Sequence, residues 1–134
     1  MGQAIALETT LKAAKLIQDQ GYKDIYLLYV GEGDKKELLK KTCQQLSIHN
    51  CIFCDPVPKN ELHNILAKAD VTFHSLYKGS FHGYLPNKIF EYMGSGKPII
   101  YAGTGDAAEI IQIARCGIVV PPENPEAFAQ VVIY

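Results

Sequence analysis

The chain has 134 residues, of which 48% are hydrophobic, and its formal net charge is -1. This length suits one compact domain, and the hydrophobic content excludes a disordered chain. The near-neutral charge argues against a nucleic-acid partner, and the sequence shows neither an apolar run of membrane-spanning length nor a signal-peptide pattern.

Helices and strands are predicted to alternate along the whole chain. The spacing of apolar residues predicts helices over 5–20, 35–46, 59–68, 86–93 and 107–114, and from 125 onward. Short apolar runs between them predict strands over 25–30, 51–53, 71–74, 99–102 and 118–120. Because no hairpin signal interrupts this order, we predict an α/β fold with a Rossmann-like, doubly wound parallel sheet covered by helices.

Several packing details follow from the same pattern. The strand over 25–30 is nearly all apolar and is therefore predicted to be central. In the next helix we expect Leu38, Leu39 and Leu46 to face the core. Asn60 is predicted to cap the helix that follows, because asparagine side chains often bond the free amides of a helix start.

The four cysteines do not form a convincing metal site. Cys51 and Cys54 form a C-x-x-C with His49 nearby, but the other histidines and Cys116 are too scattered to supply the second ligand pair that zinc needs. Strand alternation also points Cys51 and Cys54 to opposite faces. We therefore predict no metal and buried, reduced thiols, which favours the cytoplasm.

Ligands of such sheets bind outside the carboxyl ends of the strands. The loops predicted there are 31–34, 55–59, 75–87 and 103–106. The loop over 75–85 is longer than usual, which favours a functional role, and the flanking histidines, His74 and His82, are better explained as structural or solvated than as catalytic. The turn at 103–106 either approaches a ligand closely or is a plain turn in which Asp106 caps the next helix.

The helix over 86–93 has a start suited to an anionic ligand. Pro86 fits the first turn of a helix and Asn87 can cap it. The free amides of a helix start attract phosphate, and Lys88 adds a full positive charge there. Glu91, one turn later, can accept hydrogen bonds from a pair of sugar hydroxyls. The alternative is an ordinary surface helix with a solvated lysine and glutamate.

Five segments together carry a family resemblance, namely 27–33, 52–62, 69–75, 85–98 and 117–125. In this order they resemble the carboxyl-terminal, nucleotide-sugar-binding half of a GT-B fold glycosyltransferase of the retaining family 4. The resemblance covers nearly the whole chain. It implies that the donor is a UDP-sugar or GDP-sugar and that no cofactor is needed.

The resemblance also implies roles for particular residues. Glu91 matches the second glutamate of the E-x7-E motif, which binds the ribose hydroxyls. The family's diphosphate cradle is matched by the helix tip and by the backbone of the loop before it. That loop consists of Gly83, Tyr84, Leu85, Pro86 and Asn87. Val57 and Pro58 match the family's segment that brackets the base, and Gly31 and Gly33 match its loop beside the nucleotide. No catalytic residue is assigned, because Gly83 stands where the motif has its first glutamate.

The P-x-K-x-x-E form of the motif, with Pro86, Lys88 and Glu91, resembles a branch that makes bacterial surface polysaccharides and glycoconjugates. This implies a hexosyl- or amino-sugar transferase that acts on a sugar or lipid-linked sugar, in the cytoplasm or in peripheral contact with the inner face of the membrane. Compared with that family, residues 1–134 resemble a single-domain fragment without the first strand, the amino-terminal acceptor domain and the last helices. We expect such a fragment to be inactive alone.

Two other functions remain open at this stage. One is a sugar-nucleotide epimerase domain, which shares the GT-B fold but needs acidic and histidine residues placed for proton abstraction or elimination. The other is a non-enzymatic, flavodoxin-like binding module. A receiver domain of that kind would need an acidic cluster after the first strand and a lysine after the last, and the sequence shows no such set.

Overall fold

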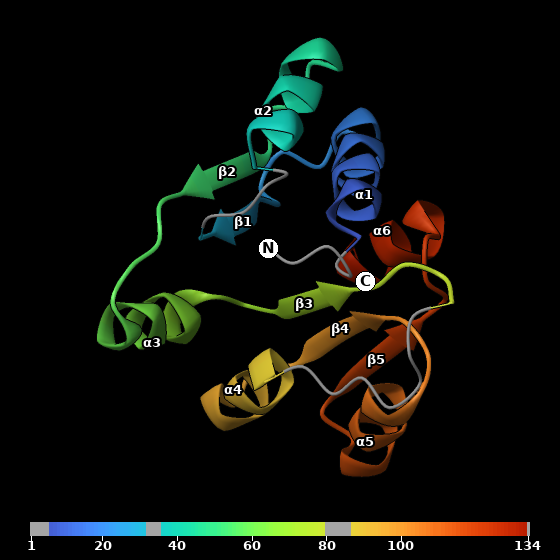
Figure 1. Ribbon diagram of the computed structural model, residues 1–134. Helices are drawn as coiled ribbons and strands as arrows, with labels where there is room; N and C mark the ends of the chain where they lie inside the picture. Colours follow the sequence, from blue (N-terminus) through green and yellow to red (C-terminus); the bar gives the residue numbers. More distant parts are fainter. Residues whose placement is uncertain (1–5, 32–35, 80–86, 134) are drawn as a thin grey trace.

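A computed structural model describes residues 6–31, 36–79 and 87–133 of the chain (Figure 1). The helices are α1 (Leu7–Asp19), α2 (Lys36–Gln45), α3 (Lys59–Lys68), α4 (Asn87–Ser95), α5 (Asp106–Ala114) and α6 (Pro125–Ile133). The strands are β1 (Leu27–Val30), β2 (Cys51–Cys54), β3 (Thr72–Ser75), β4 (Ile99–Ala102) and β5 (Gly117–Val120). Strands and helices alternate as predicted. None of these described helices has the length and apolar character needed to cross a membrane.

Every described strand pair is parallel, but the strands fall into two sheets. One sheet pairs β1 with β2, and the other has the order β3-β4-β5. Within the described residues, side chains rather than a backbone ladder connect β1 with β3. The ring of Tyr29 lies 5.0 Å from that of Phe53 and 5.8 Å from that of Phe73, which in turn meets Phe128 edge-on at 5.6 Å. This aromatic chain holds the two sheets together.

Strand β4 shows why the fold is doubly wound. Its four residues are all buried, and they alternate between two hydrophobic clusters. Ile100 and Ala102 join the cluster formed with α1 and α6, whereas Ile99 and Tyr101 join the cluster formed with α4 and α5. In Figure 1, α1 and α6 accordingly lie on one side of the β3-β4-β5 sheet, and α4 and α5 lie on the other. The predicted α/β, Rossmann-like class is confirmed.

Helices α3 and α6 start differently, because a side-chain cap is present only at α6 of the two. Helix α3 begins before Asn60, because the Pro58 carbonyl already accepts the Leu62 amide at 3.0 Å, so the prediction that Asn60 caps this helix is wrong. At α6 the side chain of Asn124 accepts the Ala127 amide at 3.0 Å, directly before Pro125. An asparagine followed by proline is a recognised start signal for a helix.

Predictions that relied on apolar residues alone overestimated burial. Of the three leucines predicted to face the core here, only Leu39 is buried, whereas Leu38 and Leu46 are 57% and 46% exposed. The prediction for Leu38 is wrong because a helix presents only one stripe to the core, and that stripe runs through Leu39 and Cys43. The prediction for Leu46 is wrong because this residue lies just beyond the end of α2 at Gln45. The strand predicted to be central, β1, is buried at Leu27 and Tyr29 but leaves Leu28 40% exposed.

Candidate functional site

The candidate site comprises the loops predicted at the carboxyl ends of the strands and the start of α4. Of the predicted site residues, the described part of the chain includes Gly31, Val57, Pro58, Lys88 and Glu91, together with the backbone of Asn87, which is the first residue of α4. The remaining predicted residues lie outside the described residues: Gly33, Gly83, Tyr84, Leu85 and Pro86. Their proposed roles stay predictions.

Helix α4 holds Lys88 and Glu91 on one side. Ile89 is fully buried and anchors the helix on the β4 side, while Lys88 is exposed and Glu91 is half-buried. Residues three apart on a helix are neighbours, so the ammonium and the carboxylate lie one turn apart. Within the part of the chain that the structure describes, neither group forms a salt bridge.

A buried aromatic pair joins β3 to β4. His74 and Tyr101 are register partners on β3 and β4, and their rings stack with centroids 5.9 Å apart. His74 is only 4% exposed, and this burial, reinforced by the charge of Lys88, lowers the pKa of His74 to about 4. The imidazole is thus neutral at pH 7. The charge of Lys88 is thus near enough to His74 to contribute to this lowered pKa.

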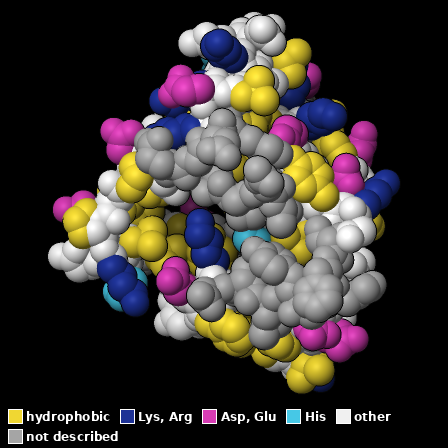
Figure 2. Space-filling model, in the orientation of Figure 1, with side chains coloured by type: hydrophobic (Ala, Val, Ile, Leu, Met, Phe, Trp, Pro, Cys, Tyr) yellow, Lys and Arg dark blue, Asp and Glu magenta, His cyan; other side chains and the backbone are white. Residues whose placement is uncertain are grey.

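The segment that follows β2 borders the same region from another side. Val57 is half-buried and Pro58 is exposed, and α3 begins directly after them and packs against α4 (Figure 1). At the neighbouring end of β1, the amide of Gly31 donates to the Cys54 carbonyl at 3.1 Å, with φ +131, a conformation suited to glycine. Figure 2 shows that this face of the molecule is hollowed in its middle, with hydrophobic, basic and histidine side chains at the border.

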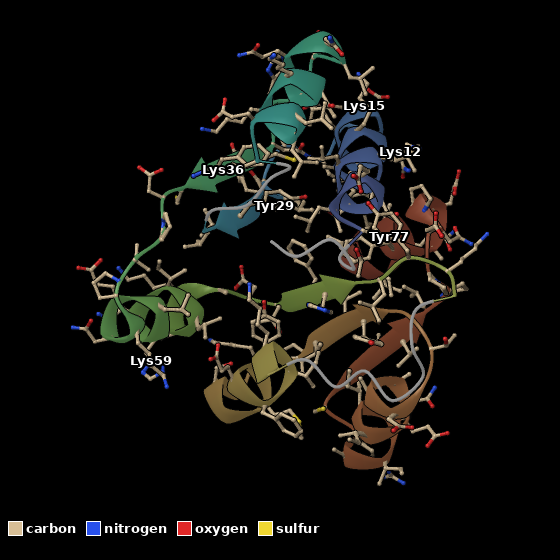
Figure 3. The ribbon with its side chains drawn as sticks, in the orientation of Figure 1. Lys12, Lys15, Tyr29, Lys36, Lys59 and Tyr77 are labelled. Carbon is tan, nitrogen blue, oxygen red and sulfur yellow. The ribbon has the colours of Figure 1, made fainter. Side chains whose placement is uncertain are left out.

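Sequence reasoning missed Lys36, a buried lysine at the start of α2. Its side chain is only 4% exposed, and its Nζ donates to Asp55 Oδ1 at 3.0 Å and to the Cys54 carbonyl at 3.4 Å. Figure 3 shows Lys36 beside the end of β2. A lysine in the first turn of a helix is electrostatically unfavourable, and an acid just after the next strand is a natural partner for it. That combination was the available signal.

The connection after β3 is anchored where it begins. Tyr77 donates its hydroxyl to Glu8 Oε2 at 2.7 Å, and the Lys78 amide donates to Glu123 Oε2 at 2.7 Å. The labelled Tyr77 in Figure 3 accordingly lies near the start of α1. These contacts fix the beginning of the long loop to α1 and to the connection between β5 and α6.

Within the described residues, the turn after β4 leads directly into α5. Gly105 precedes α5 with φ +93, and the helix start has no side-chain cap. Asp106 is instead the first residue of α5, so the alternative in which Asp106 caps the helix is wrong. Its carboxylate still favours that position, because a helix start carries partial positive charge.

The cysteines are free thiols, as predicted, although only Cys43 is buried and the other three are half-buried. Desolvation, strengthened by the nearby Cys43, raises the pKa of Cys51 to about 12, which keeps that thiol protonated. In the described ranges, no group of three or more histidine, cysteine, aspartate or glutamate side chains is placed to hold a metal ion.

Solved structures share this fold at low sequence identity. The Anabaena protein HepE in complex with UDP-glucose matches with a TM-score of 0.80 and 17% identity, over 99% of this chain and 36% of that one. The catalytic domain of the cholesterol-α-glucosyltransferase from Helicobacter pylori matches with a TM-score of 0.78 and 20% identity, over 98% of this chain and 77% of that one. These similarities establish a Rossmann-like domain of the GT-B type.

Sequence comparison adds the family. An uncharacterised glycosyltransferase of Methanocaldococcus jannaschii is 31% identical over 105 residues, which is 77% of this chain and 26% of the relative. A second from the same organism is 27% identical over 95% of this chain and 32% of its own length. The chain thus spans about a third or less of these relatives. The family model for group 1 glycosyl transferases matches residues 2–134, and the chain therefore belongs to the group 1 glycosyl transferases.

Proposed function

We propose that this chain is the nucleotide-sugar-binding, carboxyl-terminal domain of a retaining, family 4 glycosyltransferase whose donor is a UDP-sugar or GDP-sugar. The observation that carries the proposal is the placement of Lys88 and Glu91 on one side of α4, without a salt bridge in the described residues. Membership of a glycosyl transferase family supports it. The similar structures of HepE with UDP-glucose and of pneumococcal GtfA with UDP and GlcNAc support the donor class.

The proposed chemistry places the donor diphosphate at the start of α4. Sugar transfer leaves negative charge on the departing nucleoside diphosphate, and the transition state is stabilised where fixed positive groups meet that charge. The first-turn amides of α4 and the Lys88 ammonium supply such groups. One turn further along, the Glu91 carboxylate accepts hydrogen bonds from the two ribose hydroxyls. The base then extends toward α3 and the segment containing Val57 and Pro58, with Gly31 and Gly33 beside the nucleotide.

The proposal extends to the biological role. The P-x-K-x-x-E motif supports a hexosyl- or amino-sugar transferase in bacterial polysaccharide or glycoconjugate synthesis, with a sugar or lipid-linked sugar as the acceptor. We place the intact enzyme in the cytoplasm or against the inner face of the membrane. No cofactor beyond the donor takes part in this scheme.

Nucleotide should stabilise the chain if the donor assignment is correct. A ligand that binds only the native state at 100 times its Kd adds about 2.7 kcal/mol to the free energy of unfolding. We expect UDP or GDP at millimolar concentration to raise the melting temperature in a thermal-shift measurement, whereas FMN and acetyl phosphate do not. A chain stabilised by FMN would favour a flavodoxin-like module. The absence of any shift with both UDP and GDP would reject the donor assignment.

Metal chelation should leave transfer unaffected. The proposed site uses the amides of α4 and Lys88 to neutralise the diphosphate, so it needs no bound divalent cation. We expect the intact enzyme to keep its sugar-transfer rate in EDTA, measured with its donor and acceptor at fixed ionic strength. Activity that disappears with EDTA and returns with manganese would refute this arrangement.

A further inference from the structure

The contact between Lys36 and Asp55 joins a buried cation to a surface anion. The lysine side chain is 4% exposed and the aspartate side chain is 91% exposed, with 3.0 Å between Lys36 Nζ and Asp55 Oδ1. The same ammonium donates to the Cys54 carbonyl at 3.4 Å. Removing an ammonium from water is unfavourable unless partners surround it. The buried lysine is therefore tied to the point where the chain leaves β2.

That point controls the course of the segment 55–58. The segment leaves β2 at Cys54 and enters α3 at Lys59, and α3 packs against α4, which carries Lys88 and Glu91. The hydrogen bond from Lys36 also holds the pKa of the Asp55 carboxyl below its usual range, so this aspartate stays ionised at neutral pH. The backbone at the start of the segment is thus bound to α2 through a charge-assisted hydrogen bond.

We propose that Lys36 is a positioning residue for the nucleoside part of the donor: by holding Cys54 and Asp55, it fixes the segment 55–58 where the base is bound. The inference rests on the proposed function, because it assumes a nucleotide whose ribose lies at Glu91. In the proposed function, the diphosphate is bound at the start of α4 and not by this segment. The effect of Lys36 is therefore selective for the nucleoside.

Lys36→Met tests the proposal by replacing a buried charge with an apolar side chain of similar length. Because the Asp55 side chain is 91% exposed, the variant leaves no uncompensated buried charge, so we expect stability to be preserved. We expect the Kd of the nucleotide that the unaltered chain binds, UDP or GDP, to rise about tenfold by titration calorimetry, because the binding segment loses its preorganisation. The Kd of inorganic pyrophosphate and the melting temperature should stay unchanged. The matched control is Lys40→Met, one turn along α2, where the lysine is 40% exposed and pairs with Glu37; no Kd should change.

Asp55→Ala examines the same contact from its exposed partner, in case Lys36→Met does not fold. This variant should also weaken the binding of the nucleotide and leave the binding of pyrophosphate unchanged. An unchanged nucleotide Kd in either folded variant overturns the proposal, as does an equal loss of nucleotide and pyrophosphate. If the unaltered chain binds pyrophosphate but neither UDP nor GDP, the donor assignment fails and the positioning role fails with it. If the nucleotide binds equally well to all variants, only the positioning role fails.

Discussion

Gly117→Ala is expected to destabilise the protein severely by separating β5 from β4. A Cβ atom at Gly117 would lie 1.9 Å from the Ile99 carbonyl oxygen and 2.9 Å from the Ile99 nitrogen. Both are backbone atoms of the neighbouring strand, and they cannot turn aside as the end of a side chain can. The Ile99 amide also donates to the Cys116 carbonyl at 3.0 Å, so moving the strand breaks the ladder. We expect a loss of about 3 kcal/mol or more in urea unfolding followed by circular dichroism.

Gly94→Ala is the matched control for this prediction. Gly94 is an exposed glycine in α4, and a Cβ there would meet nothing within 4 Å. Alanine should raise the free energy of unfolding by about 0.5–1 kcal/mol, because it restricts the unfolded chain and favours the helix. If Gly117→Ala were as stable as the unaltered chain, the close approach of β5 to β4 would be wrong.

Glu91→Gln and Lys88→Ala are expected to weaken donor binding in different ways. The Glu91 carboxylate is proposed to accept hydrogen bonds from two ribose hydroxyls. A hydrogen bond to a charged group contributes about 1.5–3 kcal/mol to the free energy of binding. Glutamine keeps the shape but loses the charge, so the affinities for nucleoside and for nucleotide should fall alike, by about 10- to 150-fold. Lys88→Ala should weaken the binding of UDP or GDP but leave the affinity for the bare nucleoside nearly unchanged. Its effect on nucleotide affinity should shrink as the salt concentration rises.

Titration calorimetry of nucleoside and nucleotide with both variants separates the two roles. Lys97→Ala, just beyond the other end of α4, serves as the control and should change neither affinity. If both Lys88 and Glu91 were merely solvated, stability would change by less than about 0.5 kcal/mol and binding would not change at all. Should Lys88→Ala weaken nucleoside and nucleotide equally, its phosphate role would be rejected even though the domain binds nucleotide.

Local features of the sequence predicted most of the elements. The bounds of α3 and β4 agree with the prediction, because helical spacing, strand-like apolar runs and proline or glycine breaks act between near neighbours. The parallel arrangement followed from the absence of hairpin signals. The same local reasoning placed Glu91 one turn after Lys88 on the helix, since that relation needs only the 3.6-residue period.

The tertiary structure decided which surfaces are covered and which distant residues meet. Leu38 is exposed and Leu39 is buried although both are leucines, because the sheet covers one stripe of α2. Lys36 and Asp55 are 19 residues apart, and only the packing of α2 beside β2 brings them together. Gly117 is intolerant of a side chain because Ile99 lies against it. Periodicity is a property of neighbours along the chain, whereas burial and ion pairing depend on contacts between segments that the chain brings together only on folding.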